Sequence, residues 1–140
     1  MNEVGEQNEL WYRRSFWVPA AWKGKDVLLL FGAVDWRADV FVNDIMVGSH
    51  QGGFAPFSFN VTPYLNAKGT NKLVVRVWDP TDRGFQPRGK QVVRPEGIWY
   101  TPVTGIWQTV WMEPVAATHV ANIKSIPDVD NGIVNVTVCA

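Results

Sequence analysis

An alternation of side chains with a period of two, within residues 32–59, constrains the fold more than any other feature of this sequence. Apolar side chains stand at every second position of one segment: Ala38, Val40 and Val42. This spacing places them on one face of a sheet, so the segment is expected to be a β-strand. Asn43 and Asp44 tolerate positive φ, and apolar residues resume after them, which predicts a hairpin.

Short strand patterns recur along the rest of the chain. Further strands are expected over residues 10–18, 26–32, 71–79, 105–114 and 118–126. Turn residues separate these segments, and none has the 3.6-residue period of an amphipathic helix. Because one hairpin cannot bury its apolar face alone, a second sheet must cover it. The sequence therefore predicts an all-β chain folded as an antiparallel β-sandwich of jelly-roll type.

Size and charge restrict the class of protein. A chain of 140 residues with 46% hydrophobic residues is sufficient for one domain with one core. Thirteen basic residues balance thirteen acidic ones, so no net field attracts nucleic acid or an anionic membrane. No apolar run approaches the ~20 residues of a membrane span, and no signal peptide is recognisable. We expect a soluble protein with neither nucleic-acid nor membrane partners, of open localisation among cytoplasm, periplasm and secretion.

The composition is unusual in its eight tryptophans, which accompany seven phenylalanines and three tyrosines. This density of aromatic residues suits either the core of a large β-sandwich or a surface that stacks on sugar rings. Tryptophan is highly buried on average, so we expect most of the eight to lie in the core.

The sequence offers no recognisable catalytic, metal or cofactor site. His50 and His119 lie far apart and have no cysteine or acidic neighbour at metal-ligand spacing. Cys139 is the single cysteine, and no positioned base accompanies it. The acidic residues, Asp35 and Asp79 among them, fall mostly at strand ends and turns, where solubility explains them. We therefore predict no catalytic residue, no metal and no cofactor.

Residues 79–104 depart from the strand pattern. The segment is rich in Pro, Gly, Arg and Lys, and loops of such length are usually functional or mobile. Its basic and amide side chains donate hydrogen bonds and its aromatic side chains are flat, a combination that suits a hydroxylated or carboxylated sugar. The candidate substrate-binding residues are Arg88, Lys90, Gln91, Trp99 and Tyr100. Two alternatives stay open: a solvated loop pinned to the core by Trp99, and an interdomain contact.

The order of the sequence motifs resembles that of a known family. The segments LWYRRSFWVP, VLLLFGAVDWRADVFVND, VGSHQGGFAPFSFNVTPYL, NKLVVRVWD, RGKQ and IWYTPVTGIWQTVWMEPV follow one another between Leu10 and Ile126. In this combination the chain resembles the sugar-binding domain at the N-terminal side of glycoside hydrolase family 2 enzymes, the β-galactosidase, β-glucuronidase and β-mannosidase group. The resemblance implies a jelly roll like that of galactose-binding domains.

The resemblance also implies a division of the chain. Residues 1–9 are expected to be a disordered lead-in and residues 10–127 the jelly roll. Residues 128–140 would be the truncated first strand of the immunoglobulin-like domain that follows in the family, because residues 133–138 predict a strand whose partners are not in this sequence. The catalytic acid/base and nucleophile of the family are two glutamates on a separate (β/α)8 barrel further along, so the fragment would be inactive.

Expectations about the site and the partners follow from the same resemblance. Galactosidase and glucuronidase members place a sugar-contacting aspartate six residues before the glycine matched here by Gly105, and Trp99 stands at that position. This departure makes Trp99 a stacking candidate and leaves the sugar undetermined. The expected partners are carbohydrate and the missing immunoglobulin-like and barrel domains. The family begins its jelly roll upstream of Leu10, and an exposed sheet edge would favour a homo-oligomer.

Three functions compete on these grounds. The first is a noncatalytic accessory domain of a family 2 enzyme that hydrolyses terminal β-linked sugars by a two-carboxylate retaining mechanism in carbohydrate metabolism. The second is a stand-alone carbohydrate-binding module, and the third is a purely structural domain for interdomain or oligomer contacts. The strand expected after Gly132 favours the first function over the second.

Overall fold

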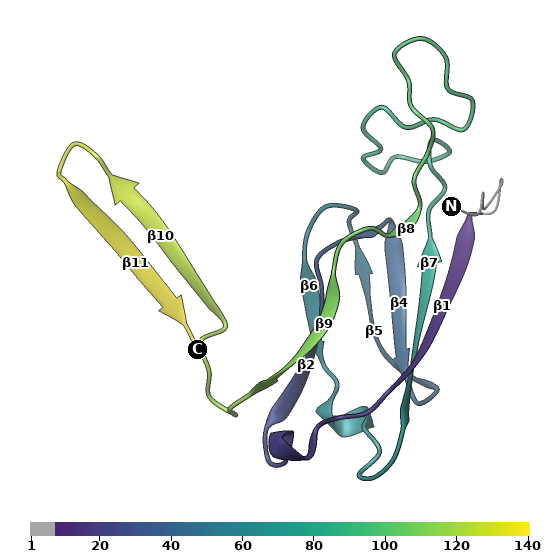
Figure 1. Ribbon diagram of the computed structural model, residues 1–140. Coiled ribbons are helices and arrows are strands. Elements are labelled where there is room, and N and C mark those ends of the chain that lie inside the picture. The colour runs from purple at the N-terminus through teal and green to yellow at the C-terminus, as the bar shows by residue number, and fades with distance from the viewer. Residues whose placement is uncertain (1–7) are drawn as a thin grey trace.

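The chain forms two facing antiparallel β-sheets, followed by a separate hairpin (Figure 1). The computed structural model describes residues 8–140, so residues 1–7 of the expected lead-in lie outside the described residues, and Glu9 already begins a strand. The strands are β1 (Glu9–Phe16), β2 (Asp26–Phe31), β3 (Val34–Asp35), β4 (Arg37–Val42), β5 (Ile45–Gln51), β6 (Phe57–Asn60), β7 (Asn71–Trp78), β8 (Gly105–Ile106), β9 (Val110–Val115), β10 (Asn122–Asp128) and β11 (Ile133–Cys139).

The strand order defines the two layers of the sandwich. One sheet has the order β1-β7-β4-β5, and the facing sheet has the order β6-β2-β9. Two 3-10 helices, η1 (Ala20–Trp22) and η2 (Thr62–Tyr64), are the helical elements within residues 8–140, and neither is long and apolar enough to cross a membrane. The prediction of an all-β antiparallel sandwich of jelly-roll type is confirmed.

The central hairpin joins β4 and β5 as the alternation predicts. Asn43 and Asp44 form its two-residue turn with φ angles of 51° and 67°, the left-handed conformation that a twisted hairpin turn requires. β5 extends to Gln51, further than the apolar residues alone indicate, because its later residues pair with β4 through a shift in register between Val40 and Phe41.

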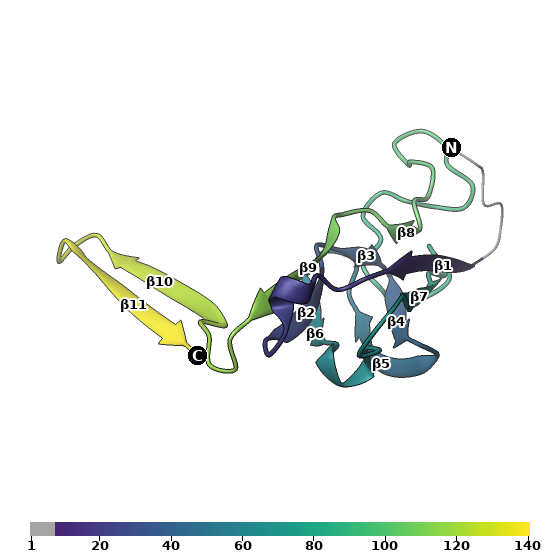
Figure 2. The same ribbon diagram turned by 60° about the horizontal axis from the view of Figure 1, so that its bottom comes forward.

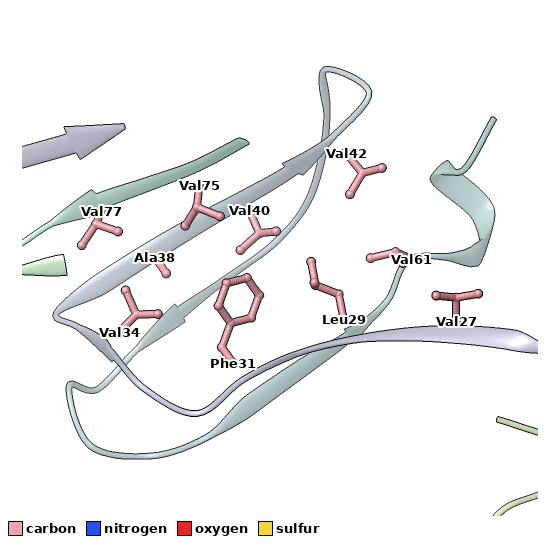
Figure 3. Packing of buried hydrophobic residues seen from close by; sticks show 10 residues of the cluster. All are labelled: Val27, Leu29, Phe31, Val34, Ala38, Val40, Val42, Val61, Val75 and Val77. Carbon is pink, nitrogen blue, oxygen red and sulfur yellow. The ribbon is translucent and has the colours of Figure 1, made fainter. Parts of the chain in front are cut away.

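The core lies between the two sheets and consists mainly of aliphatic side chains. Figure 3 shows side chains from β2, β4 and β7 meeting there, together with neighbours from β3 and the segment before η2. Val40, Val42 and Val77 are each 0% exposed. Small β-branched side chains on the inner face of each strand let the sheets pack closely.

Most of the tryptophans lie at the surface and none belongs to the buried core of residues 8–140, so the expectation that most are buried is wrong. Six of the eight are large exposed side chains: Trp11, Trp17, Trp78, Trp99, Trp107 and Trp111. In this described part of the chain, the buried hydrophobic side chains between the sheets are valine, alanine, leucine and phenylalanine, with no tryptophan among them. The tryptophans are therefore left on outer faces and loops, where they are available for contacts.

The single strand expected over residues 105–114 is divided into β8 and β9. β8 pairs with β3, whereas β9 pairs with β2. The break lies at residues 107–109, where the Trp107 and Gln108 N–H groups both donate to the Ala33 carbonyl at 3.4 Å. Between the two strands, the Trp107 Nε1–H donates a hydrogen bond to the Gly53 carbonyl at 2.7 Å.

The C-terminal hairpin corrects another expectation from the sequence. β11 has a partner within this chain, because all seven of its residues pair antiparallel with β10. Both views show the hairpin standing apart from the sandwich (Figures 1 and 2). Its apolar side chains remain exposed, among them Ile123, Ile126, Val134 and Val136.

Candidate functional site

The long loop, residues 79–104, connects β7 to β8 and projects beyond one end of the sandwich (Figure 1). Both ends of the loop are held by one buried side chain, Asp79. Its carboxylate accepts hydrogen bonds from the Thr81 N–H at 2.7 Å and from the Thr104 hydroxyl at 2.6 Å. The two ends of the loop are thereby fixed at the edge of the core.

The middle of the loop folds back on itself. The Tyr100 N–H donates to the Lys90 carbonyl at 2.8 Å, and the Val92 N–H donates to the Tyr100 carbonyl at 3.1 Å. The Gln91 side-chain oxygen accepts a hydrogen bond from the Val103 N–H. The segment around Lys90 therefore lies beside the segment around Tyr100 in a defined arrangement.

Four of the five residues predicted as a sugar site form two cation–aromatic pairs, and the fifth, Gln91, bonds to the loop backbone. The Arg88 guanidinium lies 5.6 Å from the centre of the Trp99 ring, and the Lys90 ammonium lies 5.8 Å from that of Tyr100. Both are cation–π contacts. Gln91 does not form such a contact: its side-chain oxygen accepts the hydrogen bond from the Val103 N–H and thereby stabilises the loop conformation.

A pocket of about 410 Å³ opens within the loop, beside the first of these pairs. Its lining residues are Asp82, Arg83, Arg88, Val92, Val93, Arg94 and Trp99. Three of these side chains carry a positive charge, one carries a negative charge, and one offers a flat aromatic surface. Lys90 and Tyr100 are not part of this lining.

Beneath the loop lie two carboxylates that the sequence did not reveal as neighbours. Asp35 and Asp79 are 7% and 5% exposed, and they line a small hollow together with Arg88 and Gln91. Burial, and to a smaller degree the negative charge of Asp79, raises the pKa of Asp35 to about 6. The expectation that solubility explains these residues is therefore wrong.

The proximity of Asp35 and Asp79 could not be predicted from their spacing in the sequence, because it results from strand pairing. Asp35 is the last residue of β3 and faces Gly105 across the β3–β8 pair, whereas Asp79 follows β7. A glycine approaches Asp35 closely: a Cβ atom on Gly53 would lie 2.5 Å from its carboxylate oxygen. Only the assembled fold brings these segments together.

A larger, apolar cleft of about 600 Å³ lies between the two sheets, on the side of β1 and β9. Core side chains such as Leu29, Phe31 and Val75 form much of its wall. The loop pocket, by contrast, combines charged groups with an aromatic ring. The loop pocket is thus the better candidate for a polar ligand.

The remaining polar candidates are engaged in local contacts. The His50 ring stacks on Phe57 with their centres 4.1 Å apart, and the His119 Nδ1 lies 2.9 Å from the Ala116 carbonyl. Over residues 8–140, no group of three or more His, Cys, Asp or Glu side chains is arranged to hold a metal ion.

Comparison with known proteins relates this chain to a part of several glycoside hydrolases. The chain is 33% identical over 119 residues to a β-galactosidase of Thermoanaerobacter pseudethanolicus, a match that covers 84% of this chain and 15% of that protein. It is also 33% identical to a β-glucuronidase of Formosa agariphila, covering 91% of this chain and 13% of that protein.

A solved structure shows the same relationship. Bacteroides uniformis β-glucuronidase 2 superposes with a TM-score of 0.69 at 30% sequence identity, covering 84% of this chain and 14% of that one. The chain therefore spans about one seventh of the length of these relatives. Residues 2–113 match the family described as glycosyl hydrolases family 2, sugar binding domain. This chain belongs to that family of sugar-binding domains.

Proposed function

We propose that this chain acts as the noncatalytic sugar-binding domain of a longer glycoside hydrolase that cleaves terminal β-linked sugars. The match of residues 2–113 to the family carries this proposal. A retaining enzyme of this kind needs two carboxyl groups about 5 Å apart. We assign that pair to a separate barrel domain of the longer enzyme, so the 140-residue chain supplies binding and no catalytic residue.

The long loop is proposed as the part that contacts carbohydrate, through Arg88, Lys90, Gln91, Trp99 and Tyr100. Trp99 and Tyr100 are 40% and 64% exposed, so their rings are available for stacking on a pyranose. The cation–π contacts hold the cationic groups close to these rings, which reduces the loss of side-chain entropy on binding.

The C-terminal hairpin supports a role beside further domains. An isolated two-stranded hairpin is marginally stable in water, and this one exposes apolar side chains along both strands. We propose that residues 128–140 belong to an immunoglobulin-like domain, with β10 as the strand that leads into it. A homo-oligomer is a further proposed consequence of the exposed apolar side chains.

Two other functions remain as alternatives. A stand-alone carbohydrate-binding module would use the same loop without other domains. A purely structural domain would use the exposed tryptophans and the hairpin for interdomain or oligomer contacts. Of these two alternatives, the exposed apolar side chains favour the structural domain over the stand-alone binding module.

Titration of the 140-residue chain with methyl β-glycosides of galactose, glucose, mannose and glucuronic acid tests the proposal by calorimetry or NMR. We expect binding of at least one glycoside, lost in Trp99→Ala and retained in Trp17→Ala, a matched exposed tryptophan outside the loop. Absence of binding from folded protein contradicts the sugar-binding role.

A parallel assay with chromogenic β-glycosides tests the catalytic part of the proposal. We expect no turnover by the 140-residue chain. Turnover that disappears in Glu96→Gln or Glu113→Gln would overturn the proposal, because a catalytic carboxylate would then lie within this chain.

A further inference from the structure

The charge of the loop pocket is unlike that of the chain as a whole. The chain has equal numbers of basic and acidic residues, but the pocket is lined by Arg83, Arg88 and Arg94 and by one acidic side chain, Asp82. The Asp82 Oδ2 accepts a hydrogen bond from the Val93 N–H at 3.2 Å. The lining therefore carries a surplus of positive charge, and its single carboxylate is engaged by the backbone.

The structure also shows how one of these arginines is held. The Arg88 Nη1 donates a hydrogen bond to the Asp82 carbonyl at 3.3 Å, while its guanidinium lies over the Trp99 ring. A guanidinium has five N–H donors, so donors remain for a ligand. Because the guanidinium is already held in place, less side-chain entropy is lost when a ligand binds to it.

The size of the pocket suits a single sugar ring with its substituents. Its volume of about 410 Å³ lies within the usual range for small-molecule sites. Trp99 forms an apolar wall that can pack against the C–H face of a pyranose. The arginines offer planar, forked donors, which match a carboxylate better than they match a hydroxyl group.

From these features we propose that the loop pocket recognises an acidic sugar, a uronic acid residue, with its carboxylate held by Arg88 and Arg94 and its ring against Trp99. This inference rests on the proposed function, because it names the class of carbohydrate that the loop binds. The neighbouring Lys90–Tyr100 pair lies outside the pocket and does not contact the carboxylate.

Comparison of methyl β-glucuronide with methyl β-glucoside tests the inference, because these ligands differ by a carboxylate in place of a hydroxymethyl group. Each is titrated into the 140-residue chain at low and high NaCl concentration. A charge-assisted hydrogen bond contributes enough to predict at least about tenfold tighter binding of the glucuronide. Salt should weaken binding of the glucuronide more than that of the glucoside.

Two substitutions that each remove one positive charge provide a matched pair. Arg94→Gln should reduce glucuronide binding towards the level of the glucoside, whereas Lys68→Gln, at an exposed lysine outside the loop, should leave the preference for the glucuronide intact. Arg94 is exposed, so its replacement should preserve the fold, which circular dichroism can verify. Arg88→Lys is a second variant that keeps the charge but removes the fork, and it should also lower the preference.

The outcomes separate this inference from the proposed function. Equal binding of both glycosides, or equal losses in Arg94→Gln and Lys68→Gln, would overturn the inference and leave the sugar-binding role in place. Binding of neither would also overturn the inference, and it would contradict the sugar-binding role as well if the galactoside and the mannoside also fail to bind. Inorganic phosphate or sulfate that binds as tightly as the glucuronide would show a simple anion site and would also overturn the inference.

Discussion

The sandwich and the long loop of this protein are held together by different interactions. In the sandwich, backbone pairing within each sheet and buried aliphatic side chains between the sheets leave residues such as Val40 and Val77 fully buried. In the loop, most side chains are at least partly exposed, and the order comes from individual contacts such as the Asp79 carboxylate and the Arg88–Trp99 pair.

This difference separates stability from recognition. The sandwich buries the apolar area that provides most of the folding free energy. The loop is built from polar contacts that each contribute little net stability but place charged and aromatic groups accurately. Substitutions in the sandwich should therefore change global unfolding, whereas substitutions in the loop should change local order or binding.

The largest expected effect comes from Phe31→Ala. Phe31 is fully buried between the sheets (Figure 3). Its ring stacks on that of Phe57 with the centres 4.7 Å apart. Removing a buried phenylalanine ring should lower the free energy of unfolding by about 3–5 kcal/mol. Urea unfolding followed by circular dichroism measures this change.

Phe54→Ala is the control for this substitution, because Phe54 is 59% exposed. We expect it to cost less than about 1 kcal/mol. Equal costs for the two variants would break the comparison, since stability would then not reside between the sheets.

The same division explains how much the sequence predicted. Alternation at Ala38, Val40 and Val42 identified the inner face of β4, and Asn43–Asp44 identified its turn, because these signals are local. The split between β8 and β9 was missed, since it depends on which strands pair in the assembled fold: β8 pairs with β3 and β9 with β2. Local patterns cannot report contacts of this kind.

For the candidate site, composition predicted the loop and its five residues but not their arrangement. The pairing of Arg88 with Trp99 and of Lys90 with Tyr100 depends on how the loop folds back. The burial of Asp35 beside Asp79 depends on the packing of β3 and the loop ends against the core. Such juxtapositions come from tertiary structure and leave no spacing in the sequence.

The next largest effect is expected from Asp35→Asn at neutral pH. Burial, and to a smaller degree the charge of Asp79, raise the pKa of Asp35 to about 6 in the folded chain, from its ordinary value of 3.8. The folded state therefore binds a proton more tightly than the unfolded state. The favourable contribution of protonated Asp35 is complete below about pH 4 and is lost as the pH rises through 6.

This difference in pKa between the folded and unfolded states lowers the free energy of unfolding by about 3 kcal/mol above pH 6. Asp35→Asn removes the charge, so it should be more stable than the parent chain at pH 7 and should lose this advantage near pH 4. Thermal unfolding between pH 4 and 8 measures the difference, with exposed Asp44→Asn as the control. If the difference in stability between Asp35→Asn and the parent chain stays constant from pH 4 to 8, ionisation of Asp35 does not destabilise the fold.

The smallest effect, and the sharpest separation of loop from sandwich, is expected from Thr104→Val. The substitution keeps the shape of the side chain but removes the hydroxyl that donates to Asp79 at 2.6 Å. A hydrogen bond to a charged acceptor contributes about 1.5 kcal/mol or more, and Asp79 keeps its bond from the Thr81 N–H. Amide hydrogen exchange should then accelerate in residues 79–104 while the exchange of β4 and β7 changes little. Acceleration shared equally by these strands would mean that the loop and the sandwich unfold as one cooperative unit, and the loop could not adjust to a ligand independently of the core.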